Sequence, residues 1–214
     1  MITVHTLLVG AYEVNCYIVA DEQARALVID PGADEAEIAA ALREHGLTVA
    51  GYLLTHGHMD HLCALGDLHQ RFPAPVGLAA LDARWAFTPV NQMPPYPQPI
   101  RPAGEILDVA AMPLWTGGGP ACKIIPTPGH TPGGVCYYFE KDGVLFSGDT
   151  LFAGSVGRTD LPGSSERQLG VSLRTLMQLP PATRVFPGHG PATTIAQELR
   201  TNPHLGGFVH AQAR

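Results

Sequence analysis

The sequence predicts an α/β fold, because short apolar runs of strand length alternate with segments whose apolar residues recur every three or four positions. The chain has 214 residues, and 45% of them are hydrophobic, which is enough to bury one substantial core. A chain of this length favours one domain over two. We therefore expect residues 1–214 to form a single α/β domain.

Most of the expected alternation lies in the first 90 residues. A helix over residues 62–72 is predicted by apolar side chains at helical spacing, namely Leu62, Leu65, Leu68 and Phe72. A helix over residues 34–46 has Asp34 as a candidate cap and Gly46 at its expected end. The other elements expected here are strands at residues 2–9, 13–20, 26–29, 48–54 and 76–79, and a short helix at residues 81–87.

Residues 89–102 contain six prolines. Proline removes a backbone donor and fixes φ, so a continuous helix or a central strand is excluded here and a long surface loop is expected. Such a loop either connects two elements passively or forms a lid that faces the substrate, and the sequence does not decide between them.

The second half of the chain predicts more strands than helices. Gly143 can take the positive φ of a hairpin turn, and Thr194 and Gln197 have the spacing of a capping box for a short last helix. The other expected elements are strands at residues 105–109, 122–125, 135–140, 144–147 and 183–186, and a helix at residues 164–179.

Charge and cysteine content exclude several classes of protein. The formal net charge is −6, whereas nucleic-acid-binding domains usually have a basic excess, so no nucleic-acid partner is expected. No apolar stretch is long enough for a membrane span, and residues 1–5 do not resemble a signal peptide. The cysteines form no C-x-x-C pair and lie mostly in apolar runs, where buried thiols are expected: Cys16, Cys63, Cys122 and Cys136. We therefore expect a protein of the reducing cytoplasm without a membrane partner.

A cluster of metal-binding side chains follows the strand expected at residues 48–54. His56 and His58 lie two positions apart, so an extended backbone directs both rings to one side. Asp60 and His61 lie at the start of the next helix, where the chain curls and can direct them to a second ion. Imidazole and carboxylate suit zinc, iron or manganese.

Three further candidate ligands stand next to glycine at the ends of expected strands: His130, Asp149 and His189. A loop rim at one edge of a sheet would bring them to the first cluster. Together the seven side chains provide two sites with room for water, in which Asp149 bridges the ions. One ion is bound by His56, His58 and His130, and the other by Asp60, His61 and His189.

The sequence resembles the metallo-β-lactamase superfamily, whose pattern H-x-H-x-D-H followed by H, D and H is matched along nearly the whole chain. It is most similar to short-form glyoxalase II, the hydroxyacylglutathione hydrolases. That similarity rests on Asn15-Cys16-Tyr17, Gly148-Asp149-Thr150-Leu151-Phe152, Thr193-Thr194-Ile195 and Asn202-Pro203. The resemblance implies an αββα four-layer sandwich of two mixed sheets with a dinuclear site at one edge, without the C-terminal helical domain of the long form.

The resemblance also implies a reaction. Two divalent ions, zinc or alternatively iron or manganese, would generate a bridging hydroxide that attacks a thioester such as S-lactoylglutathione or another S-2-hydroxyacyl thiol. Asp60 and Asp149 are the expected catalytic residues, and the expected partner is a small acyl-thiol. The oligomeric state stays open. Arg158 aligns with a glutathione-binding lysine, and it either binds a substrate carboxylate or pairs with Asp160. Family tyrosines are replaced by Asp160 and Pro191.

Two other reactions stay open. Gly157-Arg158-Thr159-Asp160 is shared with the persulfide dioxygenases, whose resemblance implies one iron bound by His56, His130 and Asp149. A lactone or β-lactam could also be hydrolysed at the same site, because the nucleophile does not depend on the acyl group. A binding protein without activity is not favoured, because none of the seven ligands is missing.

Overall fold

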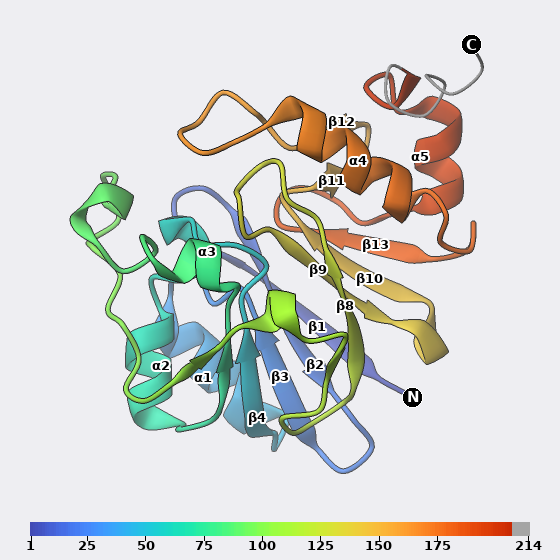
Figure 1. Ribbon diagram of the computed structural model, residues 1–214. Coiled ribbons are helices and arrows are strands. Elements are labelled where there is room, and N and C mark those ends of the chain that lie inside the picture. The colour runs from blue at the N-terminus through green and yellow to red at the C-terminus, as the bar shows by residue number, and fades with distance from the viewer. Residues whose placement is uncertain (207–214) are drawn as a thin grey trace.

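The computed structural model describes residues 1–206, and its strands form two mixed sheets of six strands each (Figure 1). The first sheet has the order β1-β2-β3-β4-β5-β6. Its first two pairs are antiparallel and the remaining three are parallel. Its strands are β1 (Thr3–Val9), β2 (Val14–Ala20), β3 (Arg25–Ile29), β4 (Thr48–Leu53), β5 (Val76–Gly77) and β6 (Ile106–Leu107).

The second sheet has the order β14-β13-β10-β9-β8-β7, with β10 and β13 parallel and the other pairs antiparallel. Its strands are β7 (Leu114–Trp115), β8 (Cys122–Pro126), β9 (Val135–Phe139), β10 (Val144–Gly148), β13 (Arg184–Pro187) and β14 (Thr193–Thr194). A separate small hairpin consists of β11 (Leu151–Phe152) and β12 (Ser155–Val156).

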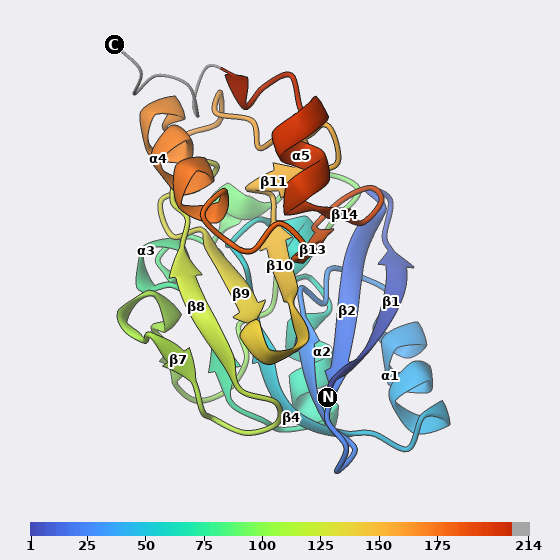
Figure 2. The ribbon, with the colours of Figure 1, turned by 90° about the vertical axis from the view of Figure 1, so that its right-hand side faces the viewer.

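Five α-helices and four 3-10 helices are present in residues 1–206. The α-helices are α1 (Glu35–Glu44), α2 (Leu65–Arg71), α3 (Ala80–Ala83), α4 (Glu166–Leu176) and α5 (Ile195–Thr201). The 3-10 helices are η1 (Met59–His61), η2 (Pro89–Asn91), η3 (Val109–Ala111) and η4 (Glu140–Asp142). In Figure 2, α4 and α5 lie at the top beside the second sheet, and α1 lies at the lower right beside β1 and β2. No helix in the described part of the chain combines the length and the apolar character needed to span a membrane.

Strand β2 shows how the layers are built. All seven of its residues are buried, which requires a covering layer on both faces of the sheet, because successive side chains point in opposite directions. Tyr17 and Val19 pack against Tyr137 and Phe146 of the second sheet. On the other face, Ile18 belongs to a cluster that includes residues of α1 and α2.

The outer face of the second sheet is covered in the same way, since Tyr138 and Leu145 pack with apolar residues of α4 and α5, namely Leu169, Leu173, Leu176 and Ile195. The four layers are therefore helix, sheet, sheet and helix. The predicted αββα sandwich is confirmed, with its main core between the sheets.

Two local predictions were wrong in part. Asp34 lies at the N-cap position of α1 as expected, but it adopts φ 53° and its side chain makes no capping hydrogen bond. Its Oδ2 accepts instead from the backbone N–H of Gly10 at 2.7 Å. The helix expected from residue 62 begins at Leu65, because η1 and a turn precede it. By contrast, Thr194 caps α5 as expected and accepts from Gln197 N at 3.1 Å.

Candidate metal centre

The seven predicted ligands lie together at one edge of the two sheets, each in a loop or short helix that follows a strand. His56 and His58 follow β4, and Asp60 and His61 lie in η1. The others follow strands of the second sheet: His130 follows β8, Asp149 follows β10 and His189 follows β13. Residues up to 133 positions apart in the sequence (His56 and His189) thereby share one site.

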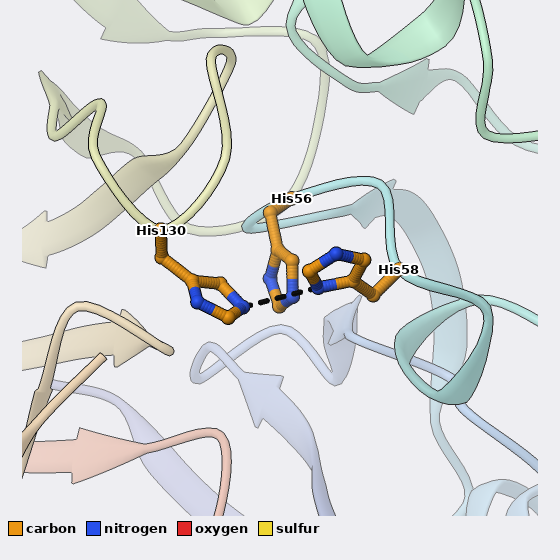
Figure 3. Close-up of side chains that lie close together, drawn as sticks. All are labelled: His56, His58 and His130. Atoms are coloured by element: carbon orange, nitrogen blue, oxygen red, sulfur yellow. Dashed lines mark hydrogen bonds between the residues drawn. The ribbon is translucent and has the colours of Figure 1, made fainter. Parts of the chain in front are cut away.

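A three-histidine group consists of His56, His58 and His130, with one ring nitrogen of each within 4.8 Å of the others. Figure 3 shows the three rings turned toward one another from two separate loops. The Nδ1 atom of His58 lies 3.0 Å from Nε2 of His130. Two nitrogens bound to one ion at about 2.1 Å each would be roughly 3.0 to 3.4 Å apart, so the separation suits a shared ion.

A second group consists of Asp60, His61 and His189, whose ligand atoms meet the same distance limit. The Nε2 atom of His189 lies 3.5 Å from Oδ2 of Asp60, and Nε2 of His61 lies 3.8 Å from it. The 3.8 Å separation is too long for a hydrogen bond. Both distances suit atoms that coordinate one cation, and we call this set the Asp60 group.

Asp149 lies between the two groups. Its Oδ1 atom is 3.5 Å from Nε2 of His61, and its Oδ2 atom is 3.5 Å from Nε2 of His130. A third ligand set, His56, His61 and Asp149, shares one histidine with each group. Oδ2 of Asp149 also lies 3.8 Å from Nε2 of His189. The carboxylate therefore lies within 4 Å of ring nitrogens of both groups, as a bridging carboxylate would.

In three of the histidine rings, a hydrogen bond determines which of the two ring nitrogens faces the site. Nδ1 of His130 lies 2.9 Å from the carbonyl oxygen of Arg158, and Nδ1 of His189 lies 2.9 Å from that of Tyr12. A carbonyl oxygen only accepts, so Nδ1 carries the proton in both rings. Nδ1 of His61 donates in the same way to Oδ2 of Asp30 at 3.0 Å. In each ring Nε2 is left to act as a ligand.

The tautomer of His56 follows from its neighbour Thr55. The Thr55 hydroxyl donates to Oδ2 of Asp30 at 2.6 Å, so it accepts from Nδ1 of His56, 3.1 Å away. Nε2 of His56 therefore has a free lone pair. Asp30 thus orients one histidine of each group, directly for His61 and through Thr55 for His56.

The residues fit a pair of cations. Within residues 1–206, only four buried side-chain polar atoms have no hydrogen-bond partner, and three of them are candidate ligand atoms: Nε2 of His56, Nε2 of His61 and Oδ1 of Asp149. A buried polar atom without a partner costs free energy. Three such atoms in one cluster of imidazoles and carboxylates indicate ligands for divalent metal ions.

Burial and charge set the protonation of the cluster. Burial, and then neighbouring imidazoles, lower the pKa of His56 well below its ordinary value. Burial and His130 lower the pKa of His58 to about 3, so both rings are neutral. Burial also disfavours the charged form of His61, but Asp149 and Asp60 outweigh it and raise its pKa to about 10. A positive charge is therefore stabilised between the carboxylates of the Asp60 group and Asp149.

The guanidinium of Arg158 pairs with Asp160 through two hydrogen bonds of 2.7 Å. Both side chains are exposed, by 61% and 68%, so the pair does not belong to the buried cluster. Of the two alternatives given for Arg158, the ion pair with Asp160 is present, and binding of a substrate carboxylate stays a prediction. The Arg158 backbone contributes separately, through the carbonyl that orients His130.

Sequence reasoning missed the residues that orient the ligands. Asp30 directly follows the strand expected at residues 26–29, but no role was predicted for it, for Thr55 or for Tyr12. Asp30 did carry a usable indication, because a carboxylate before Pro31-Gly32 at a strand end lies at the same edge as the histidines. The contact with Tyr12 uses its backbone carbonyl, which every residue has, so the residue type at this position could not indicate it.

Known proteins share this architecture along almost the whole chain. The family model described as the metallo-beta-lactamase superfamily matches residues 9–189. Two curated relatives are similar in length. The probable metallo-hydrolase YqgX of Bacillus subtilis is 34% identical over 213 residues, covering 94% of this chain and 96% of the relative. The hydroxyacylglutathione hydrolase GloC of Haemophilus influenzae is 33% identical over 223 residues, covering 92% and 95%.

Solved structures show the same likeness. The BLEG-1 B3 metallo-beta-lactamase is 36% identical, with a TM-score of 0.89 and coverage of 95% of this chain and 99% of that one. TTHA1623 in a di-iron-bound form is 37% identical, with a TM-score of 0.76 and coverage of 94% and 100%. ETHE1 from Myxococcus xanthus is 29% identical, with a TM-score of 0.73 and coverage of 97% and 88%.

Proposed function

Because the chain belongs to the metallo-β-lactamase superfamily, we propose that it is a metal-dependent hydrolase that cleaves a thioester of a 2-hydroxy acid, such as S-lactoylglutathione. The observation that carries the proposal is the pair of ligand groups with Asp149 between them. A site with two adjacent ions suits hydrolysis, in which one water and one carbonyl must be activated together.

The three-histidine group and Asp149 would hold one ion, and the Asp60 group and Asp149 the other. When bound, the two ions supply a hydroxide near neutral pH and polarise the substrate carbonyl. The mixed nitrogen and oxygen ligands suit zinc, with iron or manganese as alternatives. The di-iron form of the similar TTHA1623 supports two ions per chain and keeps iron among the candidates.

The chain's own residues orient and neutralise the site. Asp30, Thr55 and the carbonyls of Tyr12 and Arg158 hold the imidazoles in the tautomers that ligation requires. Asp60 and Asp149 provide negative charge where two cations would lie, and Asp149 keeps the two groups at a fixed separation. Ligands held in this way would need little reorganisation when the ions bind and during the reaction.

A thioester is favoured as substrate by the similarity to GloC, which is named a hydroxyacylglutathione hydrolase and is covered over 95% of its length. The chemistry agrees, because a thiol with a pKa of about 8.5 leaves as a thiolate with little help from an acid. Arg158, exposed on the loop that contacts His130, offers a guanidinium to a substrate carboxylate.

A persulfide dioxygenase is the second candidate, supported by the likeness to ETHE1 and by Gly157-Arg158-Thr159-Asp160. One iron held by His56, His130 and Asp149 would leave positions open for oxygen. That reaction gives no role to the Asp60 group, whose ligand atoms lie within the same limit of 4.8 Å as those of the three-histidine group. The complete second group favours the hydrolase.

The test combines metal analysis with a panel of substrates. Protein produced separately with zinc and with iron is analysed for metal content and assayed with S-lactoylglutathione, glutathione persulfide and a β-lactam, with Asp149→Ala as the inactive control. We expect two ions per chain and thioester hydrolysis in the parent protein. One iron with oxygen uptake on the persulfide would favour the dioxygenase, and faster β-lactam than thioester cleavage would favour a lactamase. Lack of all three activities with two ions bound would refute the enzyme proposal.

A further inference from the structure

Asp82 is a buried carboxylate outside the seven ligands. It lies in α3 and is 0% exposed. Both of its oxygens accept hydrogen bonds: Oδ1 from the backbone N–H of Gly133 at 2.7 Å, and Oδ2 from the N–H of Gly57 at 3.0 Å and the hydroxyl of Thr131 at 2.6 Å. Three donors therefore converge on one side chain in the interior.

These donors lie beside the three-histidine group. Gly57 separates His56 from His58, and Thr131 directly follows His130. The two loops that carry the three rings in Figure 3 belong to different sheets. The carboxylate of Asp82 bonds to both loops and so connects the backbone of one to the backbone of the other.

The contacts around Asp82 are close. A Cβ atom added at Gly57 would lie 3.0 Å from Cβ of Asp82, and one added at Gly133 would lie 2.7 Å from its Oδ1. Glycine at both positions allows this approach. The carbonyl of Gly57 also accepts from Nδ2 of Asn91 at 2.7 Å, so Gly57 is held through both its backbone donor and its backbone acceptor.

A carboxylate suits this position better than an amide. Burial of an ionised group is costly unless hydrogen bonds compensate it. An asparagine accepts through one oxygen only, and its NH₂ would face either the N–H of Gly133 or the donors of Gly57 and Thr131. The carboxyl group accepts from both loops at once through its two oxygens, which the amide of an asparagine cannot do.

We propose that Asp82 is a positioning residue for the three-histidine group, and that it sets the separation of the His56–His58 turn from the His130 turn so that the three imidazoles hold one ion tightly. The proposal rests on the metal-binding part of the proposed function. It concerns only one of the two ions, because none of the Asp82 hydrogen bonds reaches η1 or the loop of His189.

The experiment is a titration of metal-free Asp82→Asn with Zn²⁺ against a chromophoric chelator, together with absorption spectra of Co²⁺-loaded protein. His58→Ala and His189→Ala assign the two binding steps of the parent protein to their groups. We expect Asp82→Asn to weaken the step of the three-histidine group by about 10- to 100-fold, to change its Co²⁺ spectrum, and to leave the other step within about threefold.

Glu198→Gln is the matched control. Glu198 is also a buried carboxylate, 1% exposed, and it too accepts three hydrogen bonds, from Gly154 N at 2.9 Å, Thr193 Oγ1 at 2.6 Å and Asn202 Nδ2 at 2.8 Å. None of these donors lies next to a candidate ligand in the sequence. We expect Glu198→Gln to lower Tm like Asp82→Asn while both metal-binding steps and the Co²⁺ spectrum stay as in the parent.

Thr131→Val is the second variant, because it removes one of the three hydrogen bonds and keeps the side-chain volume. Should metal-free Asp82→Asn fail to fold, a selective loss of several-fold at the same step in Thr131→Val supports the proposal. Unchanged binding in a folded Asp82→Asn, or equal weakening of both steps, overturns it. A parent protein that binds no metal would instead refute the proposed function, so the two failures are distinguishable.

Discussion

The ring of His61 is hydrogen bonded to the carboxylate of Asp30 through its Nδ1 atom, 3.0 Å from Oδ2, and the two side chains are only 0% and 2% exposed. This bond directs Nε2 of His61 toward Asp60 and Asp149. Asp30 also accepts from the N–H of Thr55 at 2.7 Å and from its hydroxyl at 2.6 Å. One carboxylate therefore orients ligands of both groups.

Asp30→Asn is expected to weaken both metal-binding steps. The NH₂ group of the asparagine would face one of two sets of donors. These are the backbone N–H of Thr55 on one side, and the Thr55 hydroxyl with Nδ1 of His61 on the other. A buried donor left unpaired costs roughly 1–3 kcal/mol. The loss of orientation should weaken metal affinity about 10- to 100-fold. Chelator competition measures it, with Glu198→Gln as control. Parent-like affinity at both steps would show that Asp30 supports the fold and not the ligands.

Metal binding is expected to release protons. The carboxylates of Asp149 and Asp60 overcome the effect of burial and raise the pKa of His61 to about 10, so metal-free protein at about pH 8 carries a proton on His61. A metal ligand must be neutral imidazole. Affinity should therefore rise with pH, about tenfold per unit for each proton released.

Isothermal titration calorimetry in two buffers of different ionisation enthalpy, with Zn²⁺ added to metal-free protein, counts the protons released. We expect at least one per chain. Identical binding heats in the two buffers at about pH 8 would contradict a protonated His61.

The order of elements could be predicted because it is encoded locally. The leucines of α2 repeat at helical spacing, and apolar runs of strand length precede His130, Asp149 and His189. The positions of His130, Asp149 and His189 next to glycine at strand ends indicated that they could meet the first cluster at one edge of a sheet, and the family resemblance implied the two sheets. The structure brings all seven together, although their role as metal ligands stays a prediction.

Contacts distant in the sequence could not be predicted. Asp82 bonds to Gly133 across 51 positions, and Asp30 bonds to His61 across 31. Neither pair has a periodic spacing. Asp34 looks like a cap, but its carboxylate accepts from Gly10, 24 positions away. Strands of two residues such as β7 and β14 depend on their partner strands, because two residues show no alternation.

Arg158 and Asp160 are expected to change substrate affinity with opposite signs. If Arg158 binds a substrate carboxylate, Arg158→Gln raises KM for an anionic thioester severalfold, while Asp160→Asn frees the guanidinium and lowers KM. Neither change should alter Tm measurably, because both side chains are exposed and such pairs contribute little. Steady-state kinetics with an anionic and a neutral thioester measures these KM values. Equal KM values in the parent and both variants would show that Arg158 forms only the ion pair with Asp160 and does not bind the substrate.

Gly188 is expected to tolerate no side chain. An added Cβ would contact Oδ1 of Asp149 and lie 2.6 Å from Cε1 of His61. The backbone cannot move away easily, since Gly188 donates to the carbonyl of Gly148 at 2.9 Å and its own carbonyl accepts from Asn15 N at 2.8 Å. Gly188→Ala must therefore displace a ligand, and we expect metal affinity to fall at least about tenfold.

Gly190→Ala is the control from the same loop. Gly190 has φ 74° and nothing lies within 4 Å of an added Cβ, so alanine there costs backbone strain of roughly 1–3 kcal/mol without touching a ligand. Both variants should lower Tm, but only Gly188→Ala should weaken Zn²⁺ binding in chelator competition. If Gly188→Ala binds two ions with parent affinity, His61 and Asp149 do not hold metal in the positions that the structure gives them.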